Sequence, residues 1–229
     1  MAALKLYFDF MSQPSRSVYM FLKASKIPFT PKPIALRKGE HFTEEFKKIN
    51  PLSRVPVIDN NQFVLTESVA ILKYLCVKYN VADHWYPRDL QAQVRVDEYM
   101  SWHHLGLRIA AASLFREKLI IPMAKGKPIN QEKVQRWKKL VNEALDGLET
   151  AFLKTPFVSG NEISVGDVLG VCELTQLYAV KEEALFTQRP LVNAWVERVT
   201  QRLQPHFDAA HQMIYRVRDR YDDMKMAKL

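Results

Sequence analysis

The chain has 229 residues, of which 48% are hydrophobic and 25% are charged; it is therefore typical of a globular protein large enough for two modest cores. It contains no run of about 18 apolar residues, which excludes a membrane-spanning helix, and we expect no membrane partner. The formal net charge is +8, but the 33 Lys and Arg residues are scattered along the sequence. Nucleic-acid-binding proteins concentrate such residues in a stripe, so we also expect no nucleic-acid partner.

The N-terminus and the cysteines predict a cytoplasmic protein. Met-Ala-Ala-Leu-Lys is followed at once by a strand pattern and lacks the layout of a signal peptide. Cys76 and Cys172 both lie in apolar helical patterns, which is typical of small core residues in a reducing compartment.

The first 80 residues alternate between strand and helix periodicities. Leu4, Leu6, Phe8 and Phe10 recur at every second position and predict a strand with one buried face. Residues 15–26 carry a helical apolar stripe. The segment "IPFTPKPIAL" follows, and its three prolines restrict it to the edge of a sheet.

The pattern continues with a short helix over residues 43–49 and a hairpin. The hairpin strands are predicted over residues 55–58 and 63–65, with the turn at residues 59–61, and a helix is predicted over residues 67–79. The order β-α-β-α-β-β-α indicates an α/β unit with a mixed sheet.

Strand signals disappear beyond "NVADHWYPRD". Helical periodicity covers residues 90–119, 130–153, 165–180 and 191–203, and a last helix is predicted over residues 208–218. We therefore expect an α/β domain over residues 1–80, a linker over residues 81–88 and an all-helical domain over residues 89–229.

A capping box marks the start of one helix in the second region. In "EISVGDVLG", Ser164 and Asp167 have the required spacing, with Asp in place of the usual Glu. This motif is a folding signal, and we assign no chemistry to it.

The stretch "NPLSRVPVI" presents a candidate cis peptide bond before Pro56. The cis form costs an X-Pro pair only about 0.5–1 kcal/mol. A cis bond would turn the N–H and C=O groups of Val55 outward, where an extended peptide could pair with them. The alternative is an ordinary trans proline that opens an edge strand.

The stretch "LTESVAI" places Thr66, Glu67 and Ser68 at the start of a helix. The helix dipole and the free N–H groups there favour an anion, so Ser68 could bind a carboxylate while Glu67 holds an ammonium group. Together they would form a receptor for the zwitterionic end of an amino acid. The alternative is simple N-capping by Thr66, which stabilises a helix by about 1 kcal/mol.

Ser12 stands where the first strand ends and the first helix begins, with Pro14 in a position suited to the first helical turn. A hydroxyl there can donate a hydrogen bond to an anion and, if the anion is a thiolate, lower its pKa. Neither a histidine nor a G-x-S-x-G elbow accompanies Ser12, so we do not expect it to be a nucleophile. The alternative role is a helix cap.

Two other features carry no site. Strand alternation places Tyr7 on the opposite face from Leu6 and Phe8, which favours a structural role. The pair His103-His104 could indicate a metal, but adjacent helical side chains point about 100° apart and no other ligand completes a site. We expect no metal.

Taken together, these motifs resemble the cytosolic glutathione transferases, and specifically their theta class. The resemblance rests on "SQPSR", "NPLSRVPVI", "LTESVAILKYL", "WYPRDLQAQVRVDEYMSWHH" and the capping box, and it covers nearly the full length. It implies a thioredoxin-like N-terminal domain, an all-α C-terminal domain, a homodimer, and glutathione as the co-substrate.

The resemblance also implies roles for individual residues. Ser12 would be the catalytic residue that hydrogen-bonds the glutathione sulfur, and Val55, beside a cis Pro56, would pair with the cysteinyl backbone. Glu67 and Ser68 would hold the γ-glutamyl end. His41 and Arg54 would face the glycyl carboxylate, where the Arg54 guanidinium replaces a lysine often found in the family.

The hydrophobic electrophile would lie against the helical domain, with Arg108, Phe115 and Arg116 as wall residues; each of these could instead serve packing or the surface. The expected reactions are halide displacement from alkyl or aralkyl halides and reduction of organic hydroperoxides. The sequence ends soon after the last predicted helix, which predicts a short lid and an open electrophile pocket. Two alternatives remain, a non-catalytic binding or assembly module and a carrier of hydrophobic ligands.

Overall fold

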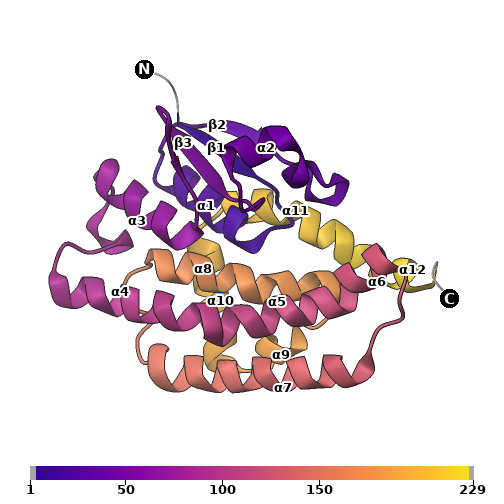
Figure 1. Ribbon diagram of the computed structural model, residues 1–229. Helices are drawn as coiled ribbons and strands as arrows, with labels where there is room; N and C mark the ends of the chain where they lie inside the picture. Colours follow the sequence, from indigo (N-terminus) through magenta and orange to yellow (C-terminus); the bar gives the residue numbers. More distant parts are fainter. Residues whose placement is uncertain (1–3, 227–229) are drawn as a thin grey trace.

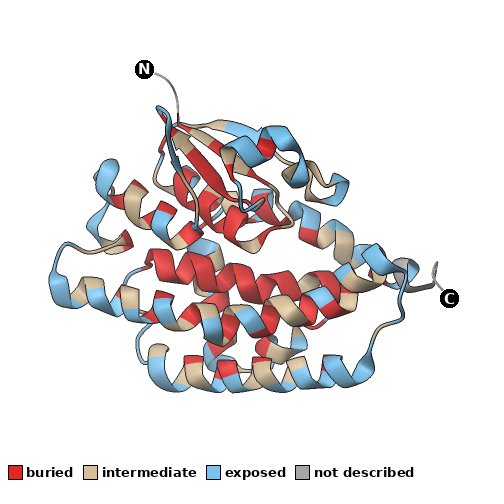
Figure 2. Cartoon of the chain, viewed as in Figure 1, coloured by how far each residue is buried: buried red, intermediate tan, exposed pale blue. Residues whose placement is uncertain are grey.

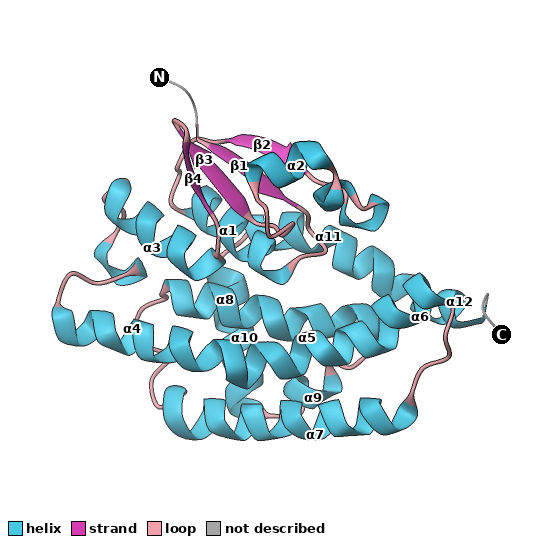
Figure 3. Ribbon diagram, viewed as in Figure 1, coloured by secondary structure: helices cyan, strands magenta, loops and turns pink. Residues whose placement is uncertain are grey.

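The computed structural model describes residues 4–226 and has a small α/β domain stacked on a larger helical one (Figure 1). In the α/β domain the elements are β1 (Lys5–Phe8), α1 (Gln13–Ala24), β2 (Thr30–Pro33), η1 (Leu36–Lys38), η2 (Glu40–Phe42), α2 (Glu44–Ile49), β3 (Val57–Asn60), β4 (Phe63–Leu65) and α3 (Ser68–Lys78). Figure 3 shows these four strands together at one end of the molecule.

The sheet has the strand order β2-β1-β3-β4. β1 pairs in parallel with β2 and antiparallel with β3, and β4 pairs antiparallel with β3. The proline-rich strand β2 therefore lies at an edge, as its prolines predict. The sheet is mixed and the order of elements matches the prediction, which confirms the thioredoxin-like α/β fold.

The structure corrects the predicted position of the hairpin turn and shows how Tyr7 packs. The predicted hairpin turn at residues 59–61 was wrong, because β3 continues to Asn60 and the turn lies at Asn61 and Gln62, both with positive φ. Tyr7 lies on the face of the sheet opposite the main core. Its ring contacts that of Phe46 on α2 at 6.3 Å between centroids, so its packing role is confirmed.

The helical domain follows a connecting segment that contains η3 (Asp83–Trp85). Its elements are α4 (Leu90–His103), η4 (His104–Arg108), α5 (Ile109–Phe115), η5 (Arg116–Ile120), α6 (Ile121–Lys125), α7 (Gln131–Gly147), η6 (Leu148–Phe152), α8 (Val165–Thr175), η7 (Gln176–Val180), α9 (Ala184–Thr187), α10 (Pro190–Arg202), α11 (His206–Asp219) and α12 (Tyr221–Met226). The predicted helices are all present, while α9 and α12 were missed because both are short.

The long predicted helix over residues 90–119 is a continuous rod that runs on to Lys125. Two π-helical turns, η4 and η5, interrupt its α-helical hydrogen bonding. π-Turns are rare and occur frequently at functional sites. Across residues 4–226, no helix combines the length and the apolar character that crossing a bilayer requires.

Helix α8 is the centre of the structure, and each of its 11 residues is buried. In Figure 2 it is a red helix between the sheet domain above and the other helices below. Its N-terminus carries the predicted capping box between Ser164 and Asp167, which is confirmed. The Asp167 carboxylate also accepts hydrogen bonds from the Val158 N–H at 2.9 Å and from the Trp195 indole at 2.8 Å.

Arg16 joins the two domains. Its guanidinium is fully buried on α1 and donates to the carbonyl oxygens of Phe10 and Cys172 and to Oε1 of Gln176, at 2.7, 3.0 and 2.7 Å. A buried charge is tolerated only when it is hydrogen-bonded in this way. Cys76 and Cys172 are both buried with free thiols, as the sequence predicts.

Candidate functional site

A pocket lies between the α/β domain and the π-turn η4. It holds about 350 Å³ of empty space, part of it open to solvent, and is lined by Pro14, Asn50, Arg54, Val55, Pro56, Thr66, Glu67, Ser68 and Arg108. The fold therefore brings together three stretches that the sequence singled out, namely the loop before β3, the start of α3 and the start of α1, and adds one arginine from the helical domain.

The loop before β3 forms one wall. The Val55–Pro56 peptide bond is cis. Val55 precedes the β1–β3 ladder, which begins at Val57, so its backbone N–H and C=O are not used by the sheet. The buried side chain of Asn50 donates to the Arg54 carbonyl at 2.8 Å and accepts from the Leu52 N–H at 3.0 Å, which fixes the loop.

The N-terminus of α3 forms the opposite wall. Glu67 occupies the N-cap position with φ +64° and ψ 111°, and no side chain caps the helix. A non-glycine residue in such a conformation costs about 1–3 kcal/mol, a cost typical of ligand-binding positions. Ser68, the first residue of α3, is buried and lines the pocket, and the first N–H groups of a helix have no intrahelical partners.

The structure excludes one role that the sequence left open, namely N-capping of α3 by Thr66. Thr66 does not cap α3, since it lies before the N-cap residue and accepts no first-turn hydrogen bond among the described residues. The start of α3 is thus uncapped, with Ser68 buried and Glu67 exposed at the pocket, and an anion fits its dipole.

Ser12 is the N-cap of α1, with its Oγ accepting the Ser15 N–H at 3.4 Å. This distance is longer than usual for an N–H···O bond, so the capping contact is weak. The side chain is 9% exposed and does not line the pocket, whereas Pro14 in the first turn of the same helix does. Within the described part of the chain, the Ser12 hydroxyl donates no hydrogen bond.

The turn that carries Ser12 is anchored from the helical domain. Arg16 holds the Phe10 carbonyl, and the side-chain amide of Gln176 donates to the Met11 carbonyl at 3.4 Å. Gln176 reaches the turn directly from η7, whereas Arg16 lies on α1 and connects the turn to the helical domain through its hydrogen bonds to Gln176 and to the Cys172 carbonyl of α8. The position of Ser12 is therefore set by both domains.

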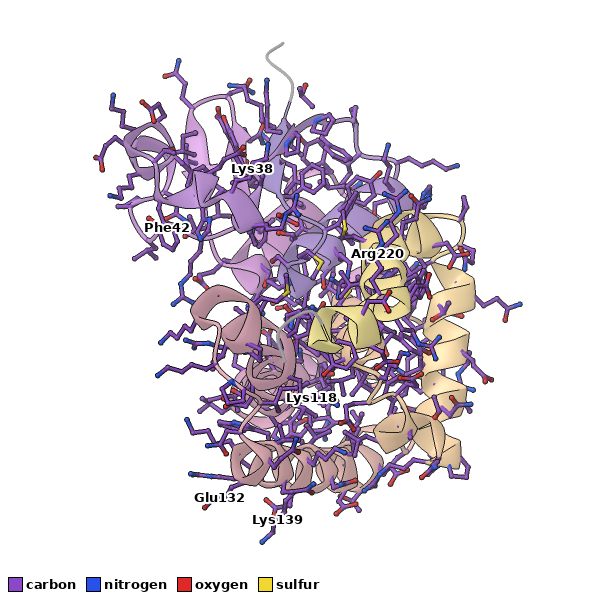
Figure 4. The ribbon with its side chains drawn as sticks, turned by 90° about the vertical axis from the view of Figure 1, so that its right-hand side faces the viewer. Lys38, Phe42, Lys118, Glu132, Lys139 and Arg220 are labelled. Atoms are coloured by element: carbon purple, nitrogen blue, oxygen red, sulfur yellow. The ribbon has the colours of Figure 1, made fainter. Side chains whose placement is uncertain are left out.

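Besides Ser12, three predicted site residues lie outside the pocket lining. His41 is on η2, where its ring lies 3.8 Å from that of Phe42 and its buried Nδ1 has no partner within the described residues. Burial lowers the pKa of His41, an effect that Asp9 partly offsets. Figure 4 shows Phe42 on the outer surface of the α/β domain. Phe115 is buried in the main core and Arg116 is exposed.

Arg108, by contrast, reaches the pocket from the end of η4. Its Nη1 lies 3.6 Å from Oε1 of the buried Glu173 on α8. Burial, together with Arg108, lowers the pKa of the neighbouring His104, and Glu67 opposes that shift. In residues 4–226 no three His, Cys, Asp or Glu side chains are placed to hold a metal ion.

Comparisons with known proteins agree with this architecture. Residues 2–76 match the family model for the glutathione S-transferase N-terminal domain, and residues 111–202 match the model for the C-terminal domain. Glutathione S-transferase theta-1 of Bos taurus is 40% identical over 94% of this chain and 90% of its own length. The chain belongs to the glutathione S-transferase family.

The relatives place this transferase in the theta class. Theta-2 of Rattus norvegicus is 44% identical over 86% of this chain and 80% of its own length. A human theta-class transferase in complex with the glutathione conjugate of 1-menaphthyl sulfate superposes with a TM-score of 0.91 at 38% identity, covering 97% of this chain and 91% of that one. Human theta-2, in complex with glutathione and an unknown ligand, also has a TM-score of 0.91 at 38% identity, covering 96% and 90%.

Sequence reasoning left three pocket residues of this transferase without a site role: Pro14, Asn50 and Thr66. The Asn50-Pro51 dipeptide is a turn signal and could have indicated a fixed loop before β3. Pro14 was interpreted only as a residue of the first helical turn and Thr66 only as a helix cap, and no local signal places them beside the pocket.

Proposed function

We propose that this transferase binds glutathione in the pocket at the N-terminus of α3 and conjugates its sulfur to hydrophobic electrophiles. The observation that carries the proposal is the convergence of the unpaired Val55 backbone, the Glu67 carboxylate and the uncapped start of α3 on one pocket. They would fit a peptide that has a backbone segment to pair with Val55, an ammonium group for Glu67 and a carboxylate for the start of α3. Glutathione has these three features.

Each wall has a role in binding. Ser68 and the first-turn N–H groups of α3 would donate hydrogen bonds to the γ-glutamyl carboxylate, and Glu67 would hold the ammonium group of the same residue. Val55 would pair with the cysteinyl backbone. Arg54, which is exposed at the pocket, would face the glycyl carboxylate. His41 would need to turn toward the same end of the tripeptide.

Ser12 would donate its hydroxyl proton as a hydrogen bond to the sulfur. A cysteine thiol has a reference pKa of about 8.5, and lowering it to about 6.5 requires about 2.7 kcal/mol of preferential stabilisation of the thiolate. The thiolate then attacks the carbon that bears a halide, a C–S bond forms and halide leaves with the bonding electron pair. With a hydroperoxide, the sulfur instead attacks the terminal oxygen: an S–O bond forms, the O–O bond breaks, and the alkoxide leaves and takes up a proton to give the alcohol. The glutathione sulfenic acid then reacts with a second glutathione to give the disulfide and water. The protein contributes orientation and charge stabilisation.

The electrophile would lie between the pocket and the long rod α4–α6, with Arg108 at its wall. Phe115 and Arg116 lie on the same rod and would act only indirectly, because Phe115 is buried in the core and Arg116 is exposed.

We expect replacement of Ser12 by Ala to leave glutathione affinity within about twofold and to lower kcat about 100-fold, the effect of removing one donor to a developing anion. Because the substitution also removes a cap, Ser12→Thr, which retains both hydroxyl and cap, is the matched control and should recover most of the turnover. The measurement is steady-state kinetics with a benzyl halide and with cumene hydroperoxide.

Undiminished turnover in Ser12→Ala would reject the role of the hydroxyl. The capping contact between Ser12 and Ser15 favours one alternative, a binding module in which Ser12 only begins α1. That alternative predicts glutathione binding without turnover in the wild-type protein.

We further propose that the protein is a cytoplasmic homodimer. Exposed apolar side chains follow the rod α4–α5 at Leu90, Val94, Leu105 and Ile109, with Leu105 81% exposed. Such a strip is typical of a subunit interface. Sedimentation equilibrium should give a dimer for the wild type and a monomer for Leu105→Glu, and a wild-type monomer would contradict the assignment.

A further inference from the structure

Arg108 brings a positive charge into a pocket in which Glu67 is the only lining carboxylate among the described residues. In the absence of another partner, a guanidinium beside a carboxylate tends to form a bidentate ion pair with it. Such a pair would occupy the carboxylate that the proposed function assigns to the ammonium group of glutathione. Yet the described residues contain no ion pair between Arg108 and Glu67; the side chain of Arg108 pairs with Glu173 instead.

Glu173 is well placed to hold this arginine. It lies on the central helix α8, with its side chain only 2% exposed, while the side chain of Arg108 is 30% exposed. The Nη1–Oε1 distance of 3.6 Å is too long for a strong hydrogen bond, so the attraction is mainly coulombic and is strengthened by burial. The other carboxylate oxygen, Oε2, is buried without a partner. Among the described residues Glu173 forms an ion pair with Arg108 alone, although the more distant Arg16 also attracts its charge.

We propose that Glu173 is a positioning residue that draws Arg108 back toward α8 and so keeps Glu67 free for the ammonium group of glutathione. The inference rests on the assignment of Glu67 in the proposed function. It adds a residue from the core of the helical domain to the control of glutathione affinity.

Arg54 does not compete in the same way. It lines the pocket but is exposed, so its attraction to Glu67 is screened by solvent. Arg108 lies between the two domains with its side chain 30% exposed, so its charge is screened less than that of Arg54, although Glu67 itself is exposed.

The arrangement is sensitive to pH because burial raises the pKa of Glu173 to about 7, against the opposing effects of Arg108 and Arg16. Below this pH the carboxyl gains a proton and its attraction for Arg108 is lost; above it, the ion pair is complete. The other ionisable groups around it are Tyr99 on α4, Cys172 on α8, and His103 and His104 beside Arg108. Burial raises the pKa of Tyr99 and of Cys172, so both stay neutral.

The test measures S-methylglutathione binding by calorimetry at pH 8, because this probe has no thiol to ionise. Glu173→Gln should raise Kd about tenfold, within the range of coupling between neighbouring residues. In Glu173→Gln combined with Arg108→Gln, the competing cation is gone and Kd should return to within about twofold of wild type. Glu182→Gln is the matched control: Glu182 is also buried in the helical domain, pairs with Lys118 and Lys138 away from the pocket, and should leave Kd unchanged.

A purely structural role for Glu173 predicts a different pattern, in which the double variant binds as weakly as Glu173→Gln. That result, or an unchanged Kd in Glu173→Gln, would overturn the inference. If Glu173→Gln does not fold, the pH dependence decides: wild-type Kd should rise several-fold between pH 8 and pH 6, whereas Arg108→Gln should show no such rise. A wild-type Kd that is constant over this range would also overturn it.

A further variant separates this inference from the assignment on which it rests. Glu67→Gln removes the proposed ammonium ligand and should weaken binding whatever residue 173 is. If Glu67→Gln weakens binding and Glu173→Gln does not, only the positioning role fails. If Glu67→Gln binds as wild type, the proposed role of Glu67 itself is wrong.

Discussion

The helices α3 and α8 begin with similar residues and are used in opposite ways. At the start of α8, Asp167 accepts hydrogen bonds from Ser164, Val158 and Trp195, and every one of these groups is buried. At the start of α3, Glu67 caps nothing and its backbone has positive φ. A satisfied helix start holds the fold together, whereas one left unsatisfied beside a pocket is available to a ligand.

The largest expected effect is a loss of stability at the start of α8, where the hydrogen-bonding groups are satisfied. Asp167→Ala removes the acceptor of four buried donors, namely the N–H groups of Val158 and Ser164, the Ser164 hydroxyl and the Trp195 indole. Each unpaired buried donor costs about 1–3 kcal/mol, so the free energy of unfolding should fall by at least about 3 kcal/mol. Urea denaturation measures this loss.

Asp146→Asn is the control for that loss. Asp146 is also an acidic residue of the helical domain, but its side chain is 65% exposed in its ion pair with Arg189. Exposed pairs contribute about 0–1 kcal/mol. Equal destabilisation by the two substitutions would show that the buried network is not what stabilises α8.

The next largest effect is expected at the start of α3, where a substitution should change glutathione affinity without changing stability. Glu67→Gln should raise the Kd for glutathione by about 10- to 100-fold, as expected when one charged hydrogen bond of about 1.5–3 kcal/mol is lost. The free energy of unfolding should change by less than about 0.5 kcal/mol, because the side chain caps nothing. Calorimetry and urea denaturation on one preparation give both values; a matching loss of stability would mean that Glu67 supports the fold after all.

The smallest effect compares two threonines. The Thr43 side chain accepts the Phe46 N–H at 3.3 Å and caps α2, while Thr66 precedes α3 without capping it. Thr43→Ala should therefore cost about 1 kcal/mol of stability and Thr66→Ala less than about 0.5 kcal/mol. Thermal unfolding of the two variants ranks them, and the reverse order would refute the assignment of the caps.

The comparison also shows what the sequence could predict. The capping box of α8 was found because Ser164 and Asp167 are three residues apart and their geometry is local. The sheet and the long helices followed from hydrophobic periodicity, which is also local. Only a family resemblance ranked Ser12 and Glu67 above simple capping roles, because a ligand-binding residue and a capping residue look alike in sequence.

The remaining features depend on contacts that are distant along the chain. Arg16 and Gln176 anchor the Ser12 turn across the domain boundary, and Glu173 reaches Arg108 from another helix. No periodicity encodes such pairs. The hairpin turn was misplaced by one residue because Asp59, Asn60 and Asn61 all favour turns, and only the pairing of Asn60 with Phe63 selects the register.

The most direct test of the role of Ser12 is an ultraviolet titration of the glutathione thiolate bound to the wild type and to Ser12→Ala. If the Ser12 hydroxyl stabilises the thiolate, the bound-thiol pKa should lie clearly below the reference of about 8.5 in the wild type and return toward that reference in the variant. Equal pKa values in the two proteins would show that Ser12 does not stabilise the thiolate.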